Sequence, residues 1–66
     1  MRYRFEGEVG PGQRELIRHG QYGRYEAAQE VAEYLACQWR RPVSIWRDTP
    51  TAKFPMETIE YTPRIG

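Results

Sequence analysis

The apolar residues of this chain repeat with two different periods, and this change of period constrains the fold more than any other feature. Residues 1–9 alternate strictly between apolar or small side chains and Arg or Glu, which is typical of a half-buried strand. Residues 24–41 repeat instead with the period of an amphipathic helix. The chain therefore combines a sheet that has one apolar face with a helix that buries this face, which predicts the α+β class.

The predicted helix has a continuous apolar stripe along one side. At 100° per residue the stripe contains Tyr25, Ala28, Val31, Ala32, Leu35, Ala36 and Trp39. Glutamates occupy the first half of the opposite side, whereas Arg40 and Arg41 stand at the end, an arrangement that the helix dipole favours. Pro42 follows and is expected to stop the helix.

A hairpin is predicted before the helix. Residues 10–13 read Gly-Pro-Gly-Gln, which is turn chemistry, so residues 14–19 should return as a second strand. The pattern is weaker there because Leu16 and Ile17 are neighbours and must point to opposite faces.

Two further strands are predicted after the helix. Residues 43–48 alternate with Val43 and Ile45 inward, whereas residues 49–55 contain two prolines and are expected to be a loop. Residues 56–62 should form the last strand, with Ile59 and Tyr61 inward, and residues 63–66 a loose tail.

The predicted order is thus ββαββ. A helical crossover makes the second and third strands parallel in direction, so the first strand fits between them, in a four-stranded antiparallel sheet of order 2-1-3-4. The helix covers one face and the other face is open. A βαββ arrangement, with residues 14–19 irregular, is the alternative. Residues 1–66 form one small domain, which we expect to be a monomer or a small homo-oligomer.

Charge and cysteine content limit the function classes. Ten basic and nine acidic residues produce a net charge of +1, so no global field draws the protein onto nucleic acid or a membrane. Cys37 is the single cysteine, so an intramolecular disulfide is impossible and a cytoplasmic location is expected. No apolar run suits a signal peptide, and none reaches the roughly 18 residues of a membrane span.

The sequence contains no pattern typical of catalysis. His19 and Ser44 are the only histidine and the only serine, and neither has partners at the spacing of a metal site or a nucleophile. The pairs Glu6 with Glu8 and Glu57 with Glu60 are best interpreted as solvated charges. We therefore expect no enzyme, no cofactor and no metal. An exposed Cys37 near Arg41 leaves a redox or regulatory role as an alternative.

The strongest functional signal is the open face of the predicted sheet. Alternation places Trp46 there, exposed to solvent, in the company of Arg2, Arg4 and Asp48. A large aromatic side chain flanked by Arg is typical of a protein-interaction hot spot and also of a base-stacking platform. Tyr22 and Arg24, in the stretch that enters the helix, form a second candidate contact.

The run YGRYEAAQEVAEYLACQWRRPVSIW, residues 22–46, resembles the helix-then-strand half of small proteins of phages and mobile elements. These include anti-CRISPR inhibitors, and the resemblance implies a non-catalytic module that blocks a host nuclease or CRISPR effector complex by occupying its surface. A nucleic-acid-binding protein that uses the open sheet face is the first alternative. A redox or regulatory protein that uses Cys37 is the second.

Overall fold

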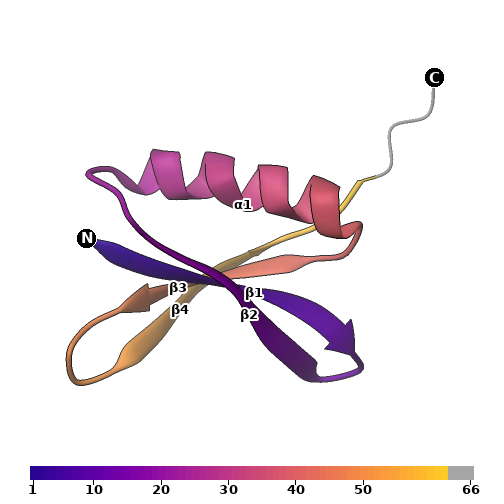
Figure 1. The fold of residues 1–66 in the computed structure, drawn as a ribbon, viewed down its shortest axis with the longest axis horizontal. Coiled ribbons are helices and arrows are strands. Elements are labelled where there is room, and N and C mark those ends of the chain that lie inside the picture. The colour runs from indigo at the N-terminus through magenta and orange to yellow at the C-terminus, as the bar shows by residue number, and fades with distance from the viewer. Residues whose placement is uncertain (63–66) are drawn as a thin grey trace.

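Within the part of the chain that the computed structural model describes, residues 1–62, four strands and one helix are present (Figure 1). They are β1 (Arg2–Gly10), β2 (Gln13–Gln21), α1 (Tyr25–Trp39), β3 (Val43–Asp48) and β4 (Lys53–Ile59). The sheet has the order β2-β1-β3-β4 and every neighbouring pair is antiparallel, which confirms the predicted ββαββ fold. The βαββ alternative is wrong because β2 pairs with β1. The predicted tail lies outside the described residues.

The core lies between α1 and one face of the sheet (Figure 1). Its fully buried large side chains are Tyr3 and Phe5 of β1 and Val43 and Ile45 of β3. Opposite them, α1 buries three alanines spaced four residues apart, Ala28, Ala32 and Ala36. Side chains this small let the helix approach the sheet closely, so the aromatic rings of β1 fill the layer between them. Of the predicted apolar stripe, Tyr25, Val31 and Leu35 also pack against this core, whereas Trp39 at its end is 36% exposed.

A β-bulge explains the weak pattern of β2. Phe5 pairs with Arg18 and Glu6 with Leu16, so Ile17 is the extra residue. Leu16 points away from the helix and is 42% exposed, whereas Ile17 packs against the core. The two neighbours therefore occupy opposite faces, as their adjacency predicted.

The helix ends two residues earlier than predicted. Arg40 adopts a left-handed conformation with φ 58° and donates its backbone N–H to Ala36 O over 2.8 Å, which closes α1 at Trp39. The Trp39 indole then donates to Glu8 O over 3.0 Å and ties this end of the helix to β1. Arg40 and Arg41 thus follow the last turn instead of belonging to it.

The position of β4 corrects a second prediction. The strand covers Lys53–Ile59 instead of residues 56–62, so it includes Pro55, which was expected to exclude a ladder. Pro55 is tolerated because β4 is an edge strand and because a bulge at Met56 separates the pairs Trp46–Pro55 and Ile45–Glu57. Ile59 packs against the core as predicted, but Tyr61 lies beyond the strand.

Glu57 joins β4 to the helix and is not a solvated charge. Its Oε1 accepts hydrogen bonds from Tyr25 Oη and Gln29 Nε2, each over 2.6 Å. The hydrogen bond from Tyr25, followed by that from Gln29, lowers the pKa of Glu57 below its ordinary value. Burial, together with the bond to Glu57, raises the pKa of Tyr25 above its ordinary value.

The lowered pKa of Glu57 predicts a loss of stability in acid. A carboxylate whose pKa is lower in the folded state stabilises the fold above its unfolded pKa, about 4.5, and loses this contribution as the pH falls further. Urea unfolding at several pH values from 7 to 3 should therefore show a steeper acid loss for the wild type than for Glu57→Gln. Glu60→Gln removes an exposed carboxylate and is the matched control. Equal pH profiles for the wild type and Glu57→Gln would contradict the assignment.

Candidate binding surface

The side of the sheet that faces away from α1, here called the open face, is built by cross-strand pairs. Residues paired in register share a face, so Arg2 lies beside Gln21 and Asp48, and Arg4 lies beside His19 and Trp46. The remaining members of the open face are Glu6, Glu8, Arg14, Leu16, Ser44, Lys53, Pro55 and Thr58. The structure thus brings together four of the predicted site residues, Arg2, Arg4, Trp46 and Asp48.

Trp46 occupies the middle of the open face but is not freely exposed. Arg4 lies opposite it in register, and the Lys53 ammonium stands 4.5 Å from the centre of its ring, in a cation–π arrangement. The side chain is partly buried, and its indole N–H is buried with no hydrogen-bond acceptor among the described residues. The prediction of a solvent-exposed indole is wrong in this respect, because the Lys53 side chain lies over the ring.

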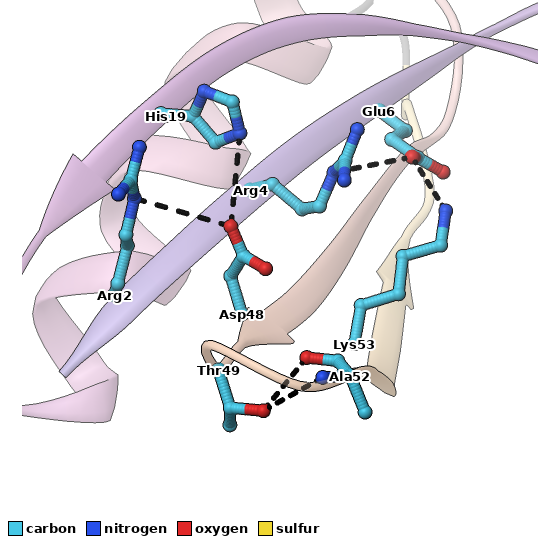
Figure 2. Close-up of polar contacts among 8 residues, drawn as sticks. All are labelled: Arg2, Arg4, Glu6, His19, Asp48, Thr49, Ala52 and Lys53. Carbon is cyan, nitrogen blue, oxygen red and sulfur yellow. Dashed lines mark hydrogen bonds and ion pairs between the residues drawn. The ribbon is translucent and has the colours of Figure 1, made fainter.

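Glu6 holds these cations in place (Figure 2). Its Oε2 lies 3.3 Å from Lys53 Nζ and 3.5 Å from Arg4 Nε, and the residue is only 8% exposed. The interpretation of Glu6 as a solvated charge is therefore wrong, whereas Glu8 is exposed as expected. The sequence does not indicate Lys53 as a site residue, because the two prolines in residues 49–55 predict a loop.

A second ionic cluster lies beside the first (Figure 2). Asp48 Oδ2 is 3.9 Å from Arg2 Nε and 3.8 Å from His19 Nε2. Arg2 and Asp48 also line a hollow of about 430 Å³ with Gln21, Thr49 and Pro50. His19 could have been found from the hairpin register, because a turn at residues 11–12 places it opposite Arg4.

The second predicted contact, Tyr22 with Arg24, belongs to the helix side of the sheet. The Tyr22 ring lies over Gly20 and packs near Tyr3 and Phe5, with ring centroids 6.4 and 6.1 Å away. Tyr22 therefore serves the core, which its place in a connecting segment did not indicate. Arg24 is exposed at the N-terminus of α1. Both residues therefore lie on the side of the sheet that α1 covers and not on the open face.

Both edges of the sheet are poor templates for another strand. The edge strand β2 has a bulge at Ile17 and exposed Arg18 and His19, while β4 has a bulge at Met56 and a proline. Bulges, prolines and charges at sheet edges discourage strand addition. Addition of a partner strand to either edge is therefore disfavoured.

Comparison with protein-family models, with curated proteins and with solved structures finds no match for this chain. Across residues 1–62, no helix is long and apolar enough to cross a membrane. Over the same residues, no three His, Cys, Asp or Glu side chains are grouped so that they could hold a metal ion. Cys37 is exposed on α1, where it lines a hollow with Glu33 and Tyr61.

Proposed function

We propose that this protein is a non-catalytic protein-binding module that docks its open face on a larger macromolecular complex and blocks it by occupying a surface. The observation that carries the proposal is Trp46, an aromatic anchor with an unsatisfied N–H at the middle of a face that no described element covers. The kind of inhibitor we propose is that of phages and mobile elements, with a host nuclease or CRISPR effector complex as the target.

The surface area of the chain and the chemistry of the open face suit a protein partner. A standard interface takes roughly 800 Å² from each partner, which is about a sixth of the 4921 Å² surface of this chain. Tryptophan and arginine dominate hot spots at the centres of such interfaces, and Arg4 lies directly beside Trp46. A partner that displaces Lys53 and supplies an acceptor would satisfy the indole N–H and bury the ring.

The ion pairs of the open face favour a protein over a nucleic acid. Binding to a phosphate backbone needs several cations that are free to neutralise it. Here Glu6 already engages Arg4 and Lys53, and Asp48 lies near Arg2. We therefore expect no binding of mixed-sequence single-stranded oligonucleotides at about 150 mM salt. Micromolar affinity in a fluorescence titration under these conditions would favour the nucleic-acid alternative instead.

The proposal predicts that Trp46→Ala separates binding from folding. Because the indole is only partly buried, we expect the free energy of unfolding to fall by about 1–2 kcal/mol and the fold to survive. An interface anchor contributes at least about 2 kcal/mol, so capture of the partner should fall roughly 30-fold or more. The measurements are a thermal melt and a quantitative pull-down from a bacterial lysate, with the captured proteins identified by mass spectrometry.

Tyr34→Ala is the matched control for this experiment. Tyr34 is a large aromatic residue on the outer side of α1 and is 58% exposed, so its removal should change neither the melt nor the capture. If Trp46→Ala remains folded and still captures the same partner, the interface lies elsewhere and the proposal fails.

A further inference from the structure

A small groove on the open face combines apolar walls with one positively charged residue. It measures about 160 Å³, and its walls are formed by Arg14, Ser44, Ile45, Trp46, Pro55, Met56, Glu57 and Thr58. The one acidic residue among them, Glu57, has its carboxylate hydrogen-bonded to Tyr25 and Gln29 of α1. A cavity of roughly this volume can hold one benzene-sized group. Trp46, Pro55 and Met56 make part of its lining apolar, and Met56 is 44% exposed. Methionine adapts its shape to different side chains, which suits a binding surface.

Arg14 adds a free positive charge to this groove. It belongs to β2, so it reaches the groove across β1. Among the described residues, no acidic side chain lies within ion-pairing distance of its guanidinium, not even its cross-strand neighbour Glu8. By contrast, Arg4 and Lys53 are both engaged by Glu6. A free guanidinium is suited to bidentate hydrogen bonding with a carboxylate.

We infer that the groove binds a short segment of the partner protein in which an Asp or Glu stands beside an apolar residue. The apolar side chain occupies the groove against Trp46 and Met56, and the carboxylate pairs with Arg14. This inference rests on the proposed function and adds to it the chemistry of the partner. A single free cation suits one carboxylate, whereas a nucleic-acid strand presents a row of phosphates.

The test is selection of peptides from a random displayed library on the intact protein. The wild type should enrich peptides that place Asp or Glu next to Phe, Leu or Met. A hydrogen bond to a charged group makes a large contribution, so Arg14→Gln should weaken a selected peptide about tenfold or more in a fluorescence titration. Arg14→Glu should instead select Lys or Arg next to the apolar residue.

Arg18→Glu makes the same charge change at an exposed residue of β2 that pairs with Phe5 and so lies on the helix side of the sheet, and it should leave the selected pattern unchanged. Arg14 is itself exposed, so its variants are expected to fold, which circular dichroism will verify. The inference is overturned if the wild type selects no acidic pattern, or if Arg14→Glu and Arg18→Glu behave alike.

The pull-down separates failure of this inference from failure of the proposed function. If Trp46→Ala loses the partner while Arg14→Glu retains it, the open face is the interface but the acidic segment is not its ligand. If neither variant loses the partner, both the inference and the proposed function are overturned. If both variants lose the partner and Arg14→Glu selects basic peptides, the results support both the inference and the proposed function.

Discussion

Phe5→Ala is expected to lower the free energy of unfolding by about 3–5 kcal/mol, because it empties the centre of a small core. Phe5 has no exposed surface, lies beside Ile45 in the sheet and packs edge-on against Tyr22 at 6.1 Å. Domains of this length are stable by only roughly 3–10 kcal/mol. The loss is therefore a large part of the total stability, and urea denaturation followed by circular dichroism would measure it.

Glu30→Ala is the control for this prediction. Glu30 is exposed on α1, so its removal should change the free energy of unfolding by no more than about 0.5 kcal/mol. Leu35→Ala should fall between the two, because Leu35 is only partly buried against the core. If Phe5→Ala were no more destabilising than Glu30→Ala, the assigned core would be wrong.

Gly7→Ala is expected to destabilise the fold by about 1–3 kcal/mol through overpacking. A methyl group at Gly7 would lie 2.6 Å from Ile17 Cδ1 and 2.9 Å from Trp39 Nε1, distances that force both side chains to move. Movement of the indole would weaken its hydrogen bond to Glu8 O and so release the end of α1 from β1. A urea titration and the tryptophan fluorescence of the folded protein would measure both effects.

Gly23→Ala makes the same chemical change where there is room for it. A methyl group at Gly23 would have no atom within 4 Å, so the free energy of unfolding should stay nearly constant or rise slightly. Neither Gly7 nor Gly23 has a positive φ that alanine would strain, so equal losses in the two variants would contradict the overpacking explanation.

Local periodicity was enough to predict which face of the helix and of the strands points toward the core. Alternation in residues 1–9 and the helical stripe determined which side chains point toward the core, because these directions follow from backbone geometry alone. The topology followed as well, since few arrangements of two hairpins and one crossover helix satisfy chain connectivity. For this reason the placement of Arg2, Arg4, Trp46 and Asp48 on one face was predictable.

The exposure and partners of these side chains were decided by tertiary structure. Pro55 predicted a loop, but the edge position and the bulge at Met56 let β4 begin at Lys53, and this brings an ammonium group over Trp46. Likewise Glu57 meets Tyr25, 32 residues away, only because α1 crosses the sheet. Local periodicity predicted the directions of the side chains in residues 1–9, in the helix and in residues 43–48, because these directions depend on backbone geometry. The neighbours that each side chain meets depend on strand register and bulges, which are set by long-range packing.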